Sequence, residues 1–365
     1  MTRRVAGLAT VLVILAAASV FADPVRIASF NAELSRDGPG LLLRDILSGD
    51  DAQILAVQDI ITRVAPNILA LQGVDWDLQG AALTAFADQL DGRYPHRFAV
   101  RPNSGLATSV DLDGDGRVAN AADSQGFGSF TGQSGMAILS RYPVITDEVR
   151  DLSDLLWADL PGHLMPVDQN GNPFPSPQAH AVQRLSSTGH WIVPILLPDG
   201  TRLTLMTYHA GPPVFDGPED RNGRRNHDET RIWQVLLDGD LGPPPPTPFV
   251  IAGAATLDPD DSDGRRIAIT NLLADARLQD PQPRSAGAAA APDQGQTGDN
   301  ALDTVDWPAP GPGRLRVDYV LPSADLKIVG AGVFWPAPDH PGHEAALSAS
   351  RHRLVWVDVI VNPAP

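Results

Sequence analysis

The feature that most constrains the fold is a series of short apolar segments with the length and alternation of β-strands, distributed along the whole chain. These segments cover residues 25–30, 67–72, 136–139, 191–197, 203–208, 249–252, 315–321, 331–335 and 354–361. Helical patterns lie between them at 53–64, 79–90 and 228–237. Many strands with interspersed helices predict an α+β fold in which two packed sheets are flanked by helices.

Polar residues at the ends of these strands are the first candidates for a functional site. Asn31 and His209 directly follow strands, Asp318 lies within R-V-D-Y-V-L-P, and His352 lies just before the last strand. Catalytic side chains are commonly placed where strands end in loops. A histidine at a strand end can instead cap backbone groups, and for His209 alone that structural interpretation is favoured. The joint occurrence of both histidines with Asn31 and Asp318 favours a functional site.

In this order and at these spacings, the segments resemble the endonuclease/exonuclease/phosphatase family, which includes pancreatic-type deoxyribonucleases, sphingomyelinases and inositol-phosphate phosphatases. The resemblance extends from Val25 to about Val361, and it is carried by S-F-N, N-I-L-A-L-Q, A-I-L-S-R-Y-P and R-V-D-Y-V-L-P. It implies a four-layer α/β/β/α sandwich of the deoxyribonuclease-like type. It also implies hydrolysis of a phosphate ester, such as a phosphodiester, with Mg²⁺ or Mn²⁺.

The resemblance assigns a role to each candidate residue. Asn31 would help to hold the divalent cation from the first strand. His209 and His352 would flank the scissile phosphate, and Asp318 would orient His352. Thr256 stands where the family has an amide that contacts the phosphate.

Several positions depart from the family pattern. Gly73 stands where a metal-binding glutamate is expected, and Ala254 stands where an acid positions or deprotonates the attacking water. Thr256 replaces the phosphate-binding amide, and Arg351 replaces the acid before the last histidine. Glycine offers Mg²⁺ no oxygen ligand from a side chain, and loss of a general base typically lowers the rate about 10²- to 10⁴-fold. Whether the chain is an enzyme therefore stays open between an impaired or re-sited phosphoester hydrolase and an inactive module that binds a phosphorylated or anionic ligand.

Asp75 and Glu33 are the alternative ligands of a re-sited metal centre. Each lies two residues beyond Gly73 or Asn31, so on a continuing strand its carboxylate would point to the same face. The displacement along the strand would be about 6 to 7 Å, which requires a displaced metal.

Two further polar groups have structural interpretations. His190, in S-S-T-G-H-W, is interpreted as a structural partner of the hairpin rather than as a cleft residue. Residues 225–229 open a predicted helix, for which a solvated polar face is the default.

A separate acidic motif at 111–118, D-L-D-G-D-G-R-V, matches the start of an EF-hand-type loop. The bidentate acid expected at position 12 is Ala122, and an aspartate follows one residue later. We expect a structural Ca²⁺ loop that orders the segment 102–135, with an acidic surface turn as the alternative. The expected Ca²⁺ ligands are Asp111, Asp113, Asp115 and Asp123.

Residues 1–22 have the pattern of a signal peptide. Arg3 and Arg4 precede the apolar stretch 5–18, and residues 20–22 offer small side chains at the positions that a signal peptidase reads. The stretch is short for a bilayer span, so a retained membrane anchor is the less favoured alternative. We expect a periplasmic or secreted protein without stable membrane insertion after cleavage.

Composition bounds the domain organisation and the ligand. The formal net charge of −17 repels polyanions and argues against non-specific nucleic-acid binding. A small phosphate ester or a lipid head group is therefore favoured over polymeric nucleic acid, and we expect a monomer. Residues 23–365 are expected to form a single domain with long loops near 102–135, 159–180 and 281–312.

Overall fold

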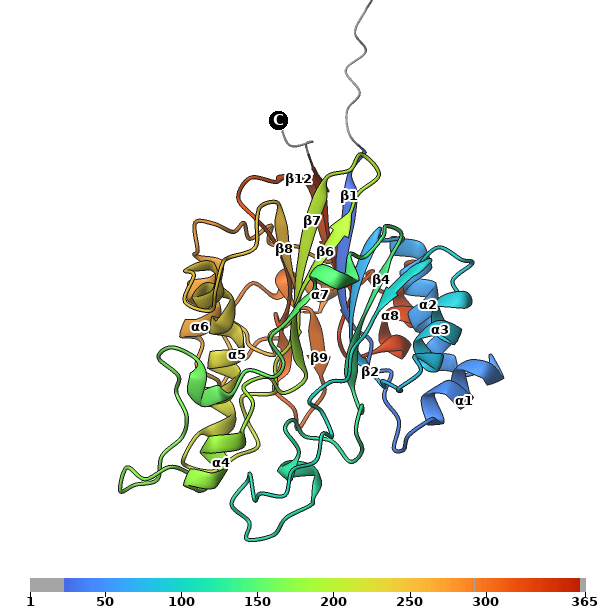
Figure 1. The fold of residues 1–365 in the computed structure, drawn as a ribbon. Helices are drawn as coiled ribbons and strands as arrows, with labels where there is room; N and C mark the ends of the chain where they lie inside the picture. The colour runs from blue at the N-terminus through green and yellow to red at the C-terminus, as the bar shows by residue number, and fades with distance from the viewer. Residues whose placement is uncertain (1–22, 292, 362–365) are drawn as a thin grey trace, which may run out of the picture.

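The protein is a sandwich of two β-sheets with helices on the outer faces, as Figure 1 shows. The computed structural model describes residues 23–291 and 293–361. The signal-peptide prediction concerns residues 1–22, which lie outside the described residues. The predicted fold class, an α+β sandwich of the α/β/β/α type, is confirmed.

The first sheet has the strand order β12-β13-β1-β2-β4-β3, in which β1 and β2 are parallel and the other neighbours are antiparallel. Its strands are β1 (Val25–Asn31), β2 (Ile68–Val74), β3 (His96–Phe98), β4 (Gly135–Ser140), β12 (Lys327–Val333) and β13 (Val355–Ile360). An apolar cluster joins its outer face to the helices α1 (Leu41–Ser48), α2 (Ala52–Val64), α3 (Ala81–Asp88) and α8 (His343–Ala349).

The second sheet has the strand order β11-β8-β7-β6-β5, in which only β7 and β8 are parallel. Its strands are β5 (Arg150–Asp151), β6 (Gly189–Leu196), β7 (Arg202–His209), β8 (Phe249–Ala254) and β11 (Asp318–Pro322). Helices α5 (Arg221–Leu237) and α6 (Ile267–Leu273) pack on its outer face.

Short elements complete the described structure. The strands β9 (Val305–Trp307) and β10 (Gly313–Leu315) form a separate two-stranded sheet. The short helices are α4 (Pro177–Val182), α7 (Ala286–Ala290) and the 3₁₀ helices η1 (Ala121–Asp123), η2 (Thr146–Glu148), η3 (Trp157–Asp159) and η4 (Asn300–Leu302). Among the described residues, none of the helices combines the length and apolar character needed to cross a bilayer.

The core between the sheets follows from strand alternation. Ile27, Val193, Leu205, Val250 and Val357 are each fully buried there. Each such side chain contributes about 1.5 to 3 kcal/mol through its removal from water. Because a one-residue slip would turn these side chains to the opposite face, the core fixes the register that aligns the strand ends.

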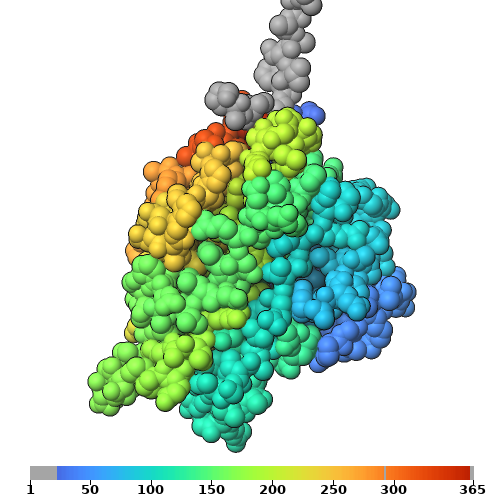
Figure 2. Space-filling view, viewed as in Figure 1, coloured from blue at the N-terminus to red at the C-terminus, as the bar shows by residue number. Residues whose placement is uncertain are grey.

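The segment 102–135 lies between β3 and β4 and reaches the first residue of β4, and its one helical turn is η1. In Figure 2 this teal segment projects from the lower end of the molecule. It therefore lies at the end of the sandwich where β1, β7 and β8 carry their C-terminal residues.

Candidate functional site

The ends of the central strands bring the candidate residues together. Asn31 ends β1 and pairs in register with Gln72 on β2. On the facing sheet, Ala254 at the end of β8 lies in register between His209 on β7 and Asp318 on β11. Residues that are far apart in the sequence therefore meet at one end of the sandwich.

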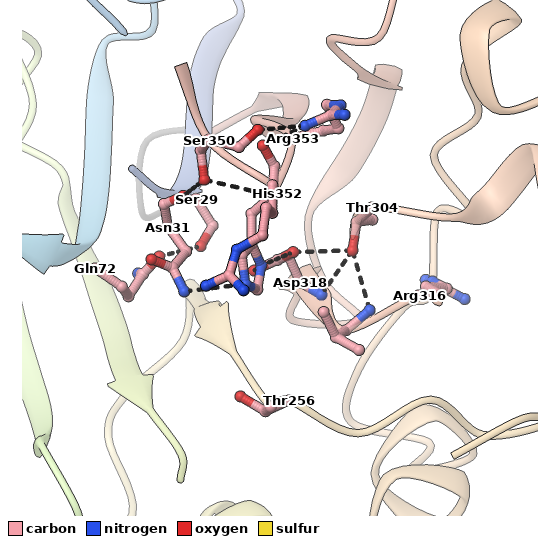
Figure 3. A network of polar contacts seen from close by, with 12 residues as sticks. Ser29, Asn31, Gln72, Thr256, Thr304, Arg316, Asp318, Ser350, His352 and Arg353 are labelled. Atoms are coloured by element: carbon pink, nitrogen blue, oxygen red, sulfur yellow. Dashed lines mark hydrogen bonds and ion pairs between the residues drawn. The ribbon is translucent and has the colours of Figure 1, made fainter. Parts of the chain in front are cut away.

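A chain of hydrogen bonds links the two sheets across this end (Figure 3). Thr304 Oγ1 donates to Asp318 Oδ2 over 2.9 Å, and His352 Nδ1 lies 2.8 Å from the same oxygen. On the other side of the ring, Asn31 Nδ2 lies 3.3 Å from His352 Nε2. If the amide donates to Nε2, the imidazole is the neutral tautomer that donates from Nδ1 to Asp318.

Gly73 leaves no room for a side chain beside Asn31. Its φ is +71°, in the left-handed region where side chains are rarely tolerated. A Cβ atom there would lie 2.5 Å from Asn31 Oδ1 and 3.0 Å from the backbone nitrogen of Glu33. The backbone conformation at position 73 therefore favours glycine. The site lacks both the metal-binding carboxylate and the space for a side chain that could carry it.

Glu33 is held by a guanidinium and by neighbouring donors. Its Oε1 accepts from Arg351 Nε over 2.8 Å and also from Nη2, while its Oε2 accepts from Arg351 N over 2.8 Å and from Ser350 Oγ over 3.1 Å. Burial by itself raises the pKa of this carboxyl, but the hydrogen bonds from Arg351 outweigh it and the pKa is lowered. Glu33 is therefore an anion already paired with a cation.

The Asp75 carboxylate also accepts hydrogen bonds at both oxygens, but its donors are uncharged groups. Its Oδ1 accepts from Ser35 Oγ over 2.7 Å and from Ser134 N over 2.9 Å, and its Oδ2 accepts from Arg36 N over 2.8 Å. Burial raises the pKa of this carboxyl despite these bonds. Asp75 anchors the loop after β1 and the turn before β4.

These donor sets do not fit a hard divalent cation at the Asn31 end of the site. Mg²⁺ needs several oxygen ligands at 2.0–2.1 Å in near-octahedral geometry. Within the described residues, Asn31 offers one amide oxygen. Both oxygens of the Glu33 carboxylate already accept from Arg351 and Ser350, and both oxygens of Asp75 accept from Ser35, Ser134 and Arg36. A metal there would first have to displace the Arg351 ion pair or the Asp75 turn.

His209 and Thr256 lie at the second half of the site. His209 is half-buried, and desolvation lowers its pKa to about 4, so its imidazole is neutral at pH 7. Its Nδ1 is buried without a hydrogen-bond partner among the described residues. Thr256 has a φ of +51°, and its hydroxyl donates to Ala210 O over 3.0 Å instead of joining the network drawn in Figure 3. With Ala254 between His209 and Asp318, the second half of the site contains no acid at the position expected for a general base.

A cavity of about 800 Å³ opens beside this cluster. Glu33, His209 and Arg351 line it where it meets the candidate site. Its other walls come mainly from the segment 102–135 and from residues 210–222, which follow β7 and include the start of α5. A ligand bound at His209 would therefore extend into this cavity.

The expectation of a solvated polar face at 225–229 is wrong, because all five residues are buried. Arg225 donates to backbone carbonyls, including Leu185 O over 2.7 Å, and burial lowers its pKa to about 10. Glu229 accepts from Gly211 N over 2.8 Å and from Ser187 N, and burial raises its pKa. The start of α5 is thus a buried polar support for the cavity wall.

The acidic motif at 111–118 forms a compact loop. Asp111, Asp113 and Asp115 can each present an oxygen within 4.8 Å of the others. Asp111 also accepts from Gly114 N over 2.6 Å and from Gly116 N over 2.9 Å. These backbone bonds hold the turn in which the three carboxylates converge.

Asp123 has a different position. It is fully buried, and its carboxylate accepts from Leu112 N over 2.9 Å and from Asn120 N over 3.1 Å. It therefore closes the loop by binding its backbone.

Two supporting residues were missed by the sequence reasoning. Thr304 orients Asp318, and it also accepts from the backbone nitrogens of Val317 and Asp318 over 3.0 Å each. Ser350 donates to Asn31 O over 2.8 Å and so fixes the loop before His352. Nothing in the spacing of a threonine or serine in a loop distinguishes these two from ordinary surface residues.

Acid should selectively destabilise the wild type relative to a His190→Gln variant. His190 is fully buried between Ser186 Oγ and Glu229 O, and desolvation lowers its pKa to about 4. From pH 6.5 down to about 4, the unfolded chain binds a proton that the folded protein excludes, so the stability contributed by neutral His190 is lost. The free-energy difference between the two proteins should shift by about 3 kcal/mol over this range.

Urea unfolding at pH 7 and pH 4 measures this shift. Burial raises the pKa of Asp303 to about 7, which acts in the opposite direction in both proteins, so the difference between them carries the prediction. A pH-independent difference would contradict a neutral His190 in the folded state.

The comparisons with known proteins agree with the sequence resemblance. The chain matches the model of the Endonuclease/Exonuclease/phosphatase family over residues 28–352. An endonuclease/exonuclease/phosphatase from Beutenbergia cavernae has a similar structure, with a TM-score of 0.55, 18% identity, and coverage of 94% of this chain and 73% of that one.

Two further solved structures are similar at lower scores. One is the sphingomyelinase C of Streptomyces griseocarneus, with a TM-score of 0.48, 16% identity, and coverage of 92% of this chain and 99% of that one. The other is the beta toxin of Staphylococcus aureus with bound magnesium ions, with a TM-score of 0.46, 11% identity and the same 92% and 99% coverage. Among curated proteins, none matches the chain. Because the family model spans most of its length, the chain belongs to the endonuclease/exonuclease/phosphatase family.

Proposed function

We propose that this chain is an exported member of the family whose phosphoester hydrolase centre is impaired, and that it binds a phosphorylated ligand at the end of the sandwich. The supporting observation is the Glu33–Arg351 ion pair beside Asn31 and Gly73. This ion pair already engages the Glu33 carboxylate, which a re-sited metal centre would need as a ligand. The Asp75 carboxylate is likewise committed to the turn that it anchors.

The remaining groups suit binding better than hydrolysis. Hydrolysis of a phosphate ester needs charge stabilisation on the phosphoryl oxygens and an activated water opposite the leaving group. Ala254, at the end of β8, has no group that could deprotonate a water. His209 therefore has no acidic partner on β8. By contrast, the His209 ring and the guanidinium of Arg351 line the cavity and can contact phosphate oxygens.

The test compares hydrolysis with binding in the same protein. We expect bis(p-nitrophenyl) phosphate and p-nitrophenyl phosphate to be turned over at background rates with Mg²⁺, Mn²⁺ or Ca²⁺, because loss of a base alone costs about 10²- to 10⁴-fold. Calorimetry should show glycerol 3-phosphate binding in the presence of EDTA, and His209→Ala should weaken it. Rapid metal-dependent turnover that His352→Ala abolishes would instead establish a re-sited, active centre.

We also propose that the loop at 111–118 binds a structural Ca²⁺ ion through Asp111, Asp113 and Asp115. Three converging carboxylates repel one another without a cation, and burial raises the pKa of Asp113. Asp123, the fourth expected ligand, supports the loop by holding Leu112 N and Asn120 N.

Calcium should therefore raise the melting temperature of the wild type, and Asp113→Ala should remove this rise. At a Ca²⁺ concentration of about 100 times the dissociation constant, the stabilisation is about 2.7 kcal/mol. Asp147→Ala, which changes an exposed aspartate outside the loop, is the control and should keep the Ca²⁺ response. Identical melting curves with Ca²⁺ and with chelator would show that the loop is an acidic surface turn.

Export is supported by the signal-peptide pattern of residues 1–22, and the location that we propose is the periplasm or the exterior of the cell. The net charge of −17 supports a small phosphorylated molecule over nucleic acid as the ligand, and we propose a monomer. Mass spectrometry of the protein expressed in a bacterial host should find a mature chain that begins at Asp23. A chain that keeps residues 1–22 and sediments with membranes would instead indicate a retained anchor.

A further inference from the structure

We propose that Glu229 and Asn226 are the positioning residues of His209, because they tie the end of β7, which carries His209, to both neighbouring strands. Both side chains come from α5, which packs on the outer face of the second sheet (Figure 1). That His209 contacts a phosphorylated ligand is taken from the proposed function, whereas its positioning by α5 follows from contacts within the protein.

The His209 ring lacks the kind of hydrogen bond that orients His352. Its Nδ1 is buried without a partner among the described residues. In His352, by contrast, Nδ1 lies 2.8 Å from Asp318 Oδ2, and Nε2 lies 3.3 Å from Asn31 Nδ2. A side chain in a binding site is held either by such bonds or by the packing and backbone around it. The position of His209 therefore depends on how the end of β7 is held.

Glu229 ties the end of β7 to β6. His209 is the last residue of β7 and lies in register with Gly189 on β6. Just beyond this pair, where the strands have ended, Glu229 Oε2 accepts from Gly211 N over 2.8 Å and Oε1 accepts from Ser187 N. The glycine permits a close approach, because a Cβ atom at position 211 would lie 2.7 Å from Ser187 Oγ. One carboxylate thus continues the link between the two strands past their last pair.

Asn226 ties the end of β7 to β8 from the same face of α5. Its Nδ2 donates to Gly211 O over 2.8 Å and to Ala255 O over 2.7 Å. Ala255 follows the last residue of β8, which lies in register with His209. Gly211 is therefore held at its N–H group by Glu229 and at its carbonyl by Asn226.

The helix that carries both side chains is itself fixed to β6 at this level. His190 Nε2 donates to Glu229 O over 2.8 Å, and His190 Nδ1 lies 2.6 Å from Ser186 Oγ. Asn226 and Glu229 are both fully buried, so their bonds lie in surroundings of low dielectric, where hydrogen bonds are strong. The end of β7 is thus fixed to a helix that is anchored independently.

The titration of His209 tests the positioning role, and it can be followed by NMR of ¹³C-histidine-labelled protein. With a pKa of about 4, the wild-type signal should hardly change from about pH 7.5 to about pH 5. Glu229→Ala releases the backbone after His209, so the ring should gain contact with water and titrate with a pKa above about 5. Loss of a negative charge would by itself lower this pKa, so a rise reports a change in position. Asn226→Ala removes no charge and should act in the same direction.

Asp228→Ala is the matched control. Asp228 is next to Glu229 and equally buried, and it accepts from Trp157 Nε1 over 2.7 Å and from Leu164 N over 2.6 Å. Its removal also leaves two donors without an acceptor, but in the segment 157–164, which does not line the cavity. The pKa of His209 should therefore stay at its wild-type value.

Two further sets of samples complete the experiment. His190 also has a pKa of about 4, so the signals of the two histidines are assigned from His190→Gln and His209→Ala. Glu229→Gln keeps the shape of the side chain and one acceptor oxygen, so it serves if Glu229→Ala does not fold. It should raise the pKa of His209 by a smaller amount, because one of the two N–H groups still loses its acceptor.

The affinity for glycerol 3-phosphate separates the positioning role from the proposed function. Glu229→Ala should weaken binding about fivefold or more, and Asp228→Ala should leave it unchanged. If the wild type binds no phosphate but the Glu229 variants raise the pKa of His209, the proposed function is wrong and the positioning role stands. If the folded Glu229→Gln and Asn226→Ala variants keep the wild-type pKa, or if Asp228→Ala raises it equally, the positioning role is wrong whether or not phosphate binds.

Discussion

Arg351→Asp should give the protein a divalent-cation site that the wild type lacks. The change removes the guanidinium that pairs with Glu33 and places a second carboxylate beside Glu33 and Asn31 Oδ1. Two carboxylates and an amide oxygen are ligands that Mn²⁺ and Mg²⁺ favour. At about 100 times the dissociation constant, Mn²⁺ should stabilise the variant by about 2.7 kcal/mol, measured as a rise in melting temperature.

The background and controls of this experiment follow from the structure. Asp113→Ala is carried in every protein compared, so that Mn²⁺ bound at the acidic loop does not contribute. Arg351→Lys keeps a cation beside Glu33 and should bind no Mn²⁺, whereas Arg351→Ala frees Glu33 alone and should bind more weakly than Arg351→Asp. If Mn²⁺ stabilised the protein that keeps Arg351 as much as the Arg351→Asp variant, the centre would already bind the cation with Arg351 in place. That result would contradict an impaired centre.

The same argument explains why restoring a glutamate at position 73 is the poorer test. The residue would have to adopt a φ of +71° with its Cβ atom 2.5 Å from Asn31 Oδ1. A left-handed conformation costs a residue with a side chain about 1–2 kcal/mol before any contact is counted. A glutamate at position 73 would therefore require the backbone and the Asn31 side chain to move, so this single substitution is not expected to build a metal site.

The sequence predicted the strands well because strand alternation and burial coincide in them. The hairpin of β6 and β7 and the strands β1, β2, β4, β8 and β13 lie within a few residues of their predicted bounds. The helices α1, α6 and α8 were not predicted. Each has only seven or eight residues, so few apolar positions repeat in them; α3 is as short, but the helical pattern at 79–90 that predicted it extends beyond its bounds.

The residues of the site could be predicted only in part, because some of their hydrogen-bond partners come from distant parts of the chain. Asn31, Asp318 and His352 stand on or beside strands whose order could be inferred, and the structure joins them directly. The commitments of Glu33 and Asp75 depend on Arg351, Ser350 and Ser134, which come from distant segments. The alternation of side chains along a strand predicts on which face a carboxylate lies. It does not predict which donor forms a hydrogen bond with that carboxylate.

The start of α5 illustrates a second limit. A run such as R-N-H-D-E is solvated in most helices, and only the loops that fold over it bury it here. Glu229 receives two backbone N–H donors from the turns that contain Ser187 and Gly211. Tertiary contacts of this kind override the polarity of the local sequence.

Asp318→Ala should be the most destabilising single change in the site. Asp318 is fully buried, and it accepts from both His352 Nδ1 and Thr304 Oγ1. Removing the acceptor of two buried donors typically costs about 1–3 kcal/mol for each donor that is left without a partner. Because whole domains are stable by only about 5–15 kcal/mol, urea unfolding at pH 7 should show a large fall in the midpoint.

Two companion variants show whether this loss comes from the hydrogen-bonded chain or from burial alone. Asp318→Asn keeps the shape and one acceptor oxygen for His352 Nδ1, so its cost should be about 1–2 kcal/mol. Asp306→Ala breaks the more exposed ion pair with Arg314, in which the carboxylate is 29% exposed, and should cost less than about 1 kcal/mol. A loss for Asp318→Ala no larger than that for Asp306→Ala would mean that Asp318 does not hold His352 in place, and the hydrogen-bonded chain from Thr304 to Asn31 would lose its structural importance.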